Sequence, residues 1–152
     1  MNQNSLPYAR SYRDLVVYQR QRQLARQVFE VSKSFPREEA YSLTDQVRRA
    51  SRSIGAQIAE AWAKRDYERH FLSKLTDADA EQNETQHWIE TAHDCAYLSS
   101  SQSKELLNFC DEIGRMLRSM KEHSADFCSP TSTRLREPPI SSRNPLLLST
   151  KN

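Results

Sequence analysis

No proline occurs between Pro36 and Pro130, and this stretch also contains the chain's two glycines, Gly55 and Gly114. Proline is excluded from helix interiors and is common in loops, so a long stretch without it is typical of helices joined by few turns. Dinucleotide-binding and Walker-type loops need several glycines close together, and two distant glycines form neither. The sequence therefore predicts an all-α chain and excludes the common glycine-rich phosphate-binding enzymes.

Apolar residues recur at helical spacing in four segments, and no alternating strand pattern competes with them. The last segment has the clearest seam, because its apolar residues alternate in steps of four and three, as in bundles and coiled coils. Ser42 and Asp45 form a pair that resembles a capping box, and the serine-rich run at 99–103 reads as a turn. We therefore expect an antiparallel up-down four-helix bundle, with helices near 14–34, from 42 to about 61, near 66–98 and near 102–126.

The 152 residues are enough for one domain. We expect a flexible N-terminus at 1–11, the bundle at 12–126 and a disordered tail at 127–152, where Ser, Thr, Pro and Arg replace apolar residues. The three cysteines show no CxxC spacing, which favours a reducing compartment. The longest aliphatic run, Leu146–Leu148, is too short for a membrane span, and no signal peptide is visible at the start. The predicted location is the cytoplasm, away from membranes.

The two halves of the predicted bundle carry opposite charge, although the whole chain has a net charge of only +2. Residues 10–65 hold twelve Lys or Arg and six Asp or Glu, a net charge of +6, whereas residues 66–126 sum to −7. One interpretation is internal, with the basic helix pair attracting the acidic one through individually weak contacts. The other is external, with the basic half facing a polyanion or the acidic face of another subunit.

Arginines recur four residues apart in the basic half, so that they share helix faces. Guanidinium groups bind phosphates in a fork and aromatic rings stack on unpaired bases, so basic residues near Trp62 and Tyr67 are typical of contacts with single-stranded or looped RNA. The alternative, in which the arginines are solvated or paired with a neighbouring helix, stays open. The predicted nucleic-acid-binding residues are Arg22, Arg26, Arg48, Arg49, Arg52, Lys64 and Arg65.

The motif E-x-x-H, used by di-iron bundles, occurs at Glu84–His87 and again at Glu90–His93. Both copies lie on one expected helix, and residues six apart point about 120° away from each other, so they do not converge on one metal pair. We predict no metal, cofactor or catalytic residue. The carboxylates of this helix are expected to accept hydrogen bonds from the arginines of the preceding helix. The predicted contacts between helices involve Asp77, Glu81, Glu84 and Trp88.

A series of short motifs runs through about residues 10–120: Tyr12–Leu15, Val17–Gln19, Ser34–Pro36, Tyr41–Ala50, Ser53–Ile54, Ile58–Glu60, Trp62–Arg65, Phe71, Lys74–Asp79, Glu81, Glu84–Gln86, Trp88 and Tyr97–Leu98. No single motif is specific, but the combined order of motifs is. In this order the chain resembles the bacterial four-helix-bundle family, also called the 23S rRNA intervening-sequence protein family.

The resemblance implies a four-helix bundle that assembles into a ring-like homopentamer and is encoded inside insertions of large-subunit ribosomal RNA genes. Similar accessory variability determinant proteins of diversity-generating retroelements work beside a reverse transcriptase and its RNA. Our first hypothesis is a non-enzymatic oligomer that binds RNA or another nucleic acid through the basic face of its first two helices. The alternative is a self-assembling scaffold or a reverse-transcriptase accessory protein without direct nucleic-acid readout.

Overall fold

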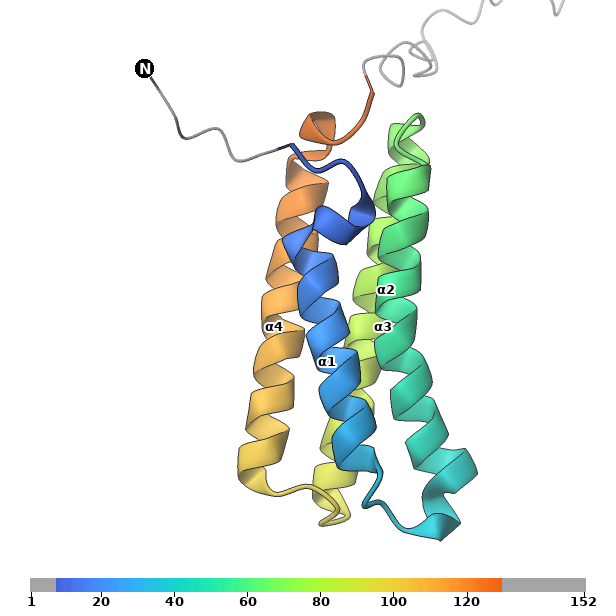
Figure 1. Ribbon diagram of the computed structural model, residues 1–152, viewed down its shortest axis with the longest axis vertical. Coiled ribbons are helices and arrows are strands. Elements are labelled where there is room, and N and C mark those ends of the chain that lie inside the picture. Colours follow the sequence, from blue (N-terminus) through green and yellow to red (C-terminus); the bar gives the residue numbers. More distant parts are fainter. Residues whose placement is uncertain (1–7, 130–152) are drawn as a thin grey trace, which may run out of the picture.

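The computed structural model describes residues 8–129, which form four long helices joined by short connections (Figure 1). Residues 1–7 and 130–152 lie outside this description, and most of the predicted disordered tail falls there. The long helices are α1 (Val16–Ser32), α2 (Asp45–Ala63), α3 (Glu68–Asp94) and α4 (Ser100–Glu122). Four short helical turns accompany them: η1 (Tyr12–Asp14), η2 (Arg37–Glu39), η3 (Ala40–Thr44) and η4 (Ser124–Asp126).

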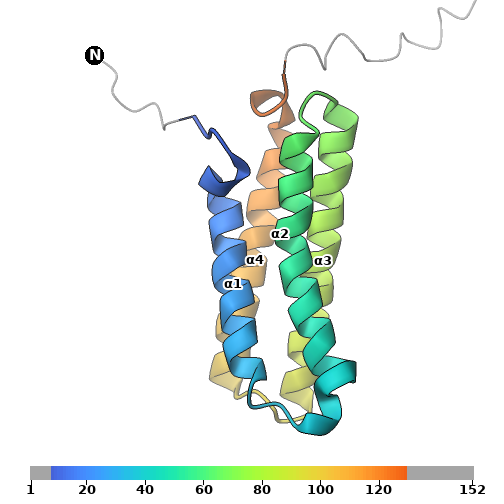
Figure 2. The same ribbon diagram turned by 45° about the vertical axis from the view of Figure 1, so that its right-hand side comes forward.

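Successive helices run in opposite directions and each long helix packs on two neighbours. α1 lies against α2 and α4, and α3 lies against the same two helices. The two views of the ribbon show this arrangement along the whole length of the bundle (Figure 1, Figure 2). The all-α, antiparallel up-down four-helix bundle predicted from the sequence is therefore confirmed.

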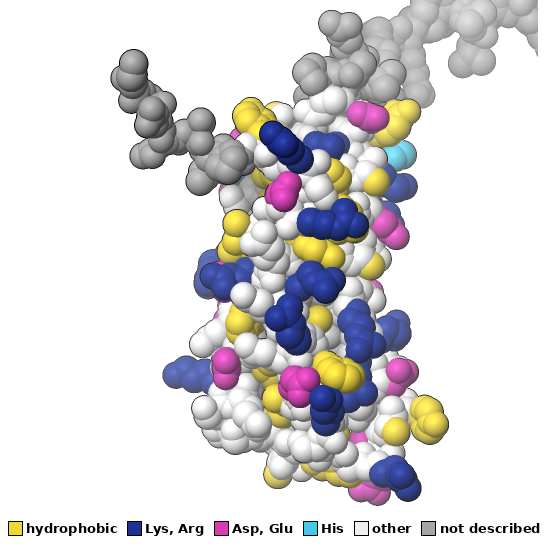
Figure 3. Space-filling model, in the orientation of Figure 1, with side chains coloured by type: hydrophobic (Ala, Val, Ile, Leu, Met, Phe, Trp, Pro, Cys, Tyr) yellow, Lys and Arg dark blue, Asp and Glu magenta, His cyan; other side chains and the backbone are white. Residues whose placement is uncertain are grey.

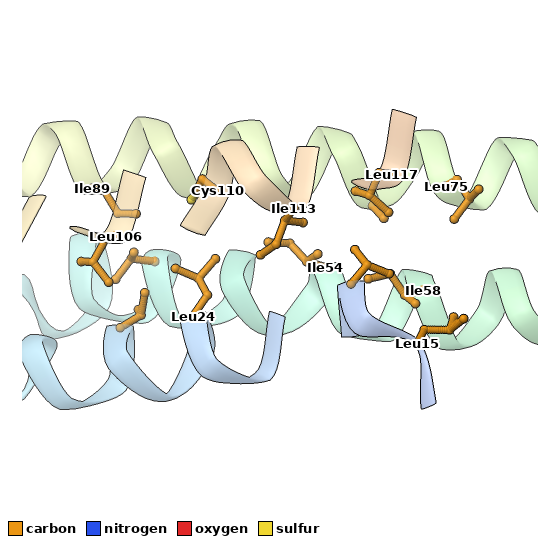
Figure 4. Close-up of a cluster of buried hydrophobic side chains, with 14 of the residues drawn as sticks. Leu15, Leu24, Ile54, Ile58, Leu75, Ile89, Leu106, Cys110, Ile113 and Leu117 are labelled. Carbon is orange, nitrogen blue, oxygen red and sulfur yellow. The ribbon is translucent and has the colours of Figure 1, made fainter. Parts of the chain in front are cut away.

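The core lies along the bundle axis and is built from the seams that the spacing predicted. Leu24 from α1 and Ile54 and Ile58 from α2 are fully buried, and α4 contributes Ile113 and Leu117 (Figure 4). At about 25 cal/mol per Å² of apolar surface removed from water, each such side chain contributes on the order of 2 kcal/mol. Burial of these stripes holds the four helices together, because amphipathic helices of this kind gain most of their stability from packing.

The third helix is shorter than the sequence indicated, because it ends at Asp94 and not near residue 98. Ala96 adopts a left-handed backbone with φ of 61°, and the N–H of Tyr97 donates to the carbonyl of Ala92 over 2.9 Å. This is the Schellman pattern that closes a helix. The serine-rich run then begins α4 and does not form the turn: Ser99 is the N-cap, and its hydroxyl accepts from the N–H of Gln102 over 3.1 Å.

The predicted cap at Ser42 is wrong. α2 begins at Asp45, after the π-helical turn η3, and the Ser42 hydroxyl donates to a carboxylate oxygen of Glu39 over 2.7 Å. Since η2, η3 and α2 follow one another without a break, residue 42 is not a free helix start that needs a cap.

The bundle continues past residue 126, where the sequence placed its end. The ring of Phe127 stacks on that of Phe71, with centroids 6.0 Å apart. The N–H of Ser129 donates to the carbonyl of Arg65 over 3.3 Å. The first three residues of the expected tail, 127–129, therefore lie against the end of the bundle, because Phe127 adds an apolar ring to its core.

Candidate nucleic-acid interface

A groove of about 480 Å³ runs between α1 and α2. Arg22, Arg26 and Phe29 line it from α1, where steps of four and three place them on one face. Arg52 lines it from α2. Its other lining residues are two tyrosines, a buried glutamine and small side chains: Tyr12, Tyr18, Gln21, Ala25, Gly55, Ala56 and Ala59.

The ring of Phe29 lies at the centre of a cluster of cations. The guanidinium carbons of Arg48 and Arg52 lie 4.7 and 5.8 Å from its centroid, and the Lys33 ammonium lies 4.8 Å from it. The Nε of Arg48 also donates to the hydroxyl of buried Ser32 over 2.8 Å. Arg48 is thus held by an aromatic ring and by a hydrogen bond through its Nε.

Four arginines of this face have no carboxylate partner within residues 8–129. Ion pairs there involve Arg20, Lys33, Arg49 and Lys74, but not Arg22, Arg26, Arg48 or Arg52. Figure 3 shows dark blue Lys and Arg side chains spread along this face, with yellow apolar side chains and some magenta Asp or Glu side chains between them. Like charges gathered without a counter-ion repel one another, so an anion placed among them is stabilised.

Two of the seven predicted residues lie elsewhere. Lys64 and Arg65 follow the end of α2, about 18 Å of helix from Arg52 at 1.5 Å per residue. The Arg65 guanidinium lies 3.5 Å from the Trp62 ring centroid, and its Nε donates to the Trp62 carbonyl over 2.9 Å. Arg65 lines a separate hollow of about 820 Å³ at the end of the bundle. Five of the seven predicted residues therefore lie in the groove or, as Arg48 and Arg49 do, beside it. The other two, Lys64 and Arg65, lie at the end of α2.

The acidic half contacts the basic half at specific points. Glu84 of α3 lies 3.6 Å from Nη2 of Arg49 and accepts from the Trp88 indole over 3.2 Å. At Lys74 the positive charge lies on α3 and the negative charge on α2. Its ammonium pairs with Glu60 of α2 over 2.8 Å and with Asp77 of its own helix over 3.7 Å. Of the arginines expected to meet carboxylates on the third helix, Arg49 does, whereas Arg48 and Arg52 turn to Phe29.

Glu81 lies beside this ion-paired layer. Its own burial, followed by repulsion from the Glu84 carboxylate, raises the pKa of Glu81 above 4.5, while the Arg49 guanidinium acts in the opposite direction. One of its carboxylate oxygens is buried without a hydrogen-bond partner in the described chain. Ionisation of Glu81 therefore lowers the free energy of unfolding.

The E-x-x-H motifs are engaged in ordinary contacts. The His87 ring packs edge-on against Trp88 with centroids 4.7 Å apart, and His93 Nε2 lies 3.2 Å from the hydroxyl of Ser100. Within residues 8–129, no group of three or more His, Cys, Asp or Glu side chains is placed to hold a metal ion. Burial raises the pKa of the Cys110 thiol to about 12, which keeps it protonated at neutral pH.

The aromatic residues of the groove are the part that sequence reasoning missed. Tyr12 and Tyr18 pack edge-to-face with centroids 4.9 Å apart, and the Arg22 guanidinium donates to the Tyr18 hydroxyl over 3.4 Å. A signal was present, because Tyr18 and Arg22 are four residues apart and share a helix face. The aromatic residues expected to stack on bases, Trp62 and Tyr67, lie at the end of α2 and just before α3 instead.

The model of the 23S rRNA-intervening sequence protein family matches residues 13–119, which contain all four helices except the last turn of α4. The chain belongs to that family. A solved structure, described as a protein with unknown function from the S23 ribosomal protein family of Bacteroides thetaiotaomicron VPI-5482, is 29% identical with a TM-score of 0.64. The match covers 70% of this chain and 96% of that one.

No protein with a curated functional description matches the chain. Among the helices of residues 8–129, none combines the length and apolar character that a membrane span requires. Membership of the intervening-sequence family agrees with the four-helix fold.

Proposed function

We propose that this chain is a non-enzymatic, cytoplasmic, oligomeric RNA-binding protein that holds RNA against the α1–α2 face. The observation that carries the proposal is the convergence of Arg22, Arg26, Arg48 and Arg52, none with a carboxylate partner in the described chain, on one groove and its Phe29 rim. Guanidinium groups offer paired donors to phosphate oxygens, and each phosphate contact displaces bound cations from the nucleic acid.

The first experiment measures RNA affinity against salt. The variant Arg22→Gln/Arg26→Gln/Arg52→Gln removes three charges and breaks no ion pair of the described structure. We expect affinity for a labelled RNA at low salt to fall about tenfold or more, and the slope of log K against log salt to decrease by about two, since each phosphate contact contributes roughly 0.7 on single strands.

The matched control is Lys104→Gln/Arg115→Gln/Arg118→Gln, which removes the same charge from exposed positions on α4. It should change affinity much less than the groove variant, because those residues lie on the other helix pair. Equal losses in the two variants would mean that net charge alone drives binding. An unchanged affinity in the groove variant would reject the proposed interface.

The opposite charges of the two halves favour a second candidate, a self-assembling scaffold. In that case the basic half of one subunit docks on the acidic half of the next, a head-to-tail contact that closes into a ring such as the pentamer implied by the family resemblance. Within one chain, Arg49 and Glu84 already use part of this complementarity. Light scattering at low and high salt separates the candidates, because assembly through the arginines dissociates in salt.

A partnership with a reverse transcriptase remains part of this second candidate. Such an enzyme can be bound through the RNA that it carries or through its own protein surface. A reverse-transcriptase partner is therefore compatible with a groove that binds RNA and with a groove that binds protein. Co-purification with and without ribonuclease treatment distinguishes the two routes. Loss of the partner after ribonuclease treatment would favour the RNA-mediated one.

A further inference from the structure

We infer that the α1–α2 groove takes an unpaired RNA strand, with its bases against aromatic rings, and discriminates against duplex RNA. This inference rests on the proposed function and names the form of RNA that the site selects. A row of exposed arginines alone would serve any polyanion. What distinguishes this groove is that aromatic rings lie at both ends of a hollow that has depth, with arginines between them.

The aromatic side chains occupy two stations along α1. Tyr18 packs against Tyr12 at the first, and Phe29 lies under Arg48 and Arg52 at the second. All three rings line the groove. Bases in a duplex are stacked on one another inside the helix and leave only sugars, phosphates and groove edges for a protein, whereas unpaired bases stack on aromatic rings and on guanidinium planes.

Small side chains give the groove its depth. Ala25, Gly55 and Ala56 line it between the two stations, and Gln21 forms part of its floor. Gln21 is buried and its Nε2 donates to the carbonyl of Ser51 over 2.8 Å, so the position of its amide is fixed. A flat ring can enter such a slot between two helices, whereas the rounded backbone of a duplex meets only its rims.

The spacing of the stations indicates a strand and not a free nucleotide. Tyr18 and Phe29 are eleven residues apart on one helix, or about 16 Å at 1.5 Å per residue. Stacked nucleotides advance about 3.4 Å each, so on the order of five are needed to reach both stations. Arg22 and Arg26 lie between the stations, where the phosphates of such a strand would pass.

The test compares one 12-nucleotide RNA without self-complementarity, alone and annealed to its complement, by fluorescence anisotropy at fixed salt. We expect the single strand to bind at least tenfold more tightly than the duplex. In a series of uridylates, affinity should rise until about five nucleotides are present, and free uridine monophosphate should not compete. Similar affinity for strand and duplex, or full competition by the mononucleotide, would overturn the inference.

The variant Tyr18→Leu/Phe29→Leu removes one ring from each station and keeps every positive charge. We expect a loss of about tenfold or more in affinity for the single strand, since stacking on each ring commonly contributes a factor of five or more, with duplex affinity within about twofold. Tyr41→Leu is the control, because Tyr41 is 92% exposed and lies outside the groove. Equal losses for strand and duplex would show that the rings do not select the strand.

Two further measurements separate a loss of stacking from misfolding and from a loss of contacts between subunits. Phe29→Trp retains a ring, so single-strand affinity should be kept even if the double leucine variant folds poorly. Light scattering on each variant detects a second use of the groove, because a change in subunit number on loss of the rings would assign it to an interface between subunits and overturn the inference. Absence of binding to either form of RNA would reject the proposed function itself.

Discussion

The amide group of Gln21 fills the space beside Gly55: a Cβ at residue 55 would lie 2.3 Å from the Gln21 Oε1 and 2.6 Å from its Cδ. The glutamine is buried, and its amide is tied to the carbonyl of Ser51. On α4, a Cβ at residue 114 would likewise lie 2.9 Å from the Nε2 of buried Gln82 of α3. The two glycines of the chain therefore each admit a buried glutamine from the neighbouring helix.

Substitution Gly55→Ala should destabilise the fold by about 1–2 kcal/mol in urea unfolding. The new methyl group must displace the Gln21 amide and its hydrogen bond, and this loss exceeds the helix-propensity gain of up to about 1 kcal/mol. In a Gln21→Ala background the clash is gone, so the same substitution should become neutral or stabilising. An effect of the same sign and size in both backgrounds would show that the two residues are not coupled.

Ala96 is the one non-glycine residue with positive φ in the described chain, and it closes α3. Replacing it with glycine should raise the free energy of unfolding by about 0.5–1 kcal/mol, because glycine enters the left-handed region without the steric cost of a Cβ. Ala80→Gly, at an exposed position inside α3, should lower it by a similar amount. Destabilisation by both glycines would contradict the Schellman geometry at residue 96.

The raised pKa of Glu81 gives a pH-dependent prediction. The folded chain holds this proton more tightly than the unfolded chain, so the cost of ionising Glu81 sets in as pH rises past the unfolded value near 4.5 and is complete above the folded pKa. Glu81→Gln mimics the protonated form. It should therefore be more stable than the parent chain at pH 8 and equal to it at pH 4.

Urea unfolding at the two pH values checks this difference. Glu90→Gln serves as the control, since Glu90 lies exposed on the same helix. It should show little difference from the parent chain at either pH. A benefit of Glu81→Gln that is the same at pH 4 and pH 8 would mean that packing, and not charge, explains it.

Helix periodicity made the fold predictable. Leu106, Cys110, Ile113 and Leu117 repeat in steps of four and three, and all four are buried in the bundle. The spacing of the apolar residues in such a seam is set within one helix, so it is visible in a single sequence. Helix ends were harder, because Ser42 and Asp45 match a cap pattern while the chain before them is already helical.

The site was only partly predictable for a related reason. The spacing of Arg22 from Arg26, and of Arg48 from Arg52, placed each pair on one face of its own helix. The sequence does not contain the register between α1 and α2, which brings Arg48 and Arg52 over Phe29 and sets Gln21 against Gly55. Contacts across helices follow from that register, so the aromatic part of the groove emerged only in three dimensions.

Photo-crosslinking identifies the surface of the protein that RNA touches, and so decides whether RNA lies in the α1–α2 groove. A single-stranded RNA containing 4-thiouridine is irradiated with the full chain, and the crosslinked tryptic peptides are identified by mass spectrometry. Binding in the groove predicts crosslinks in peptides 14–20 and 27–33, which contain Tyr18 and Phe29. Crosslinks confined to α3, α4 or the end of α2, with those two peptides unmodified, would contradict it.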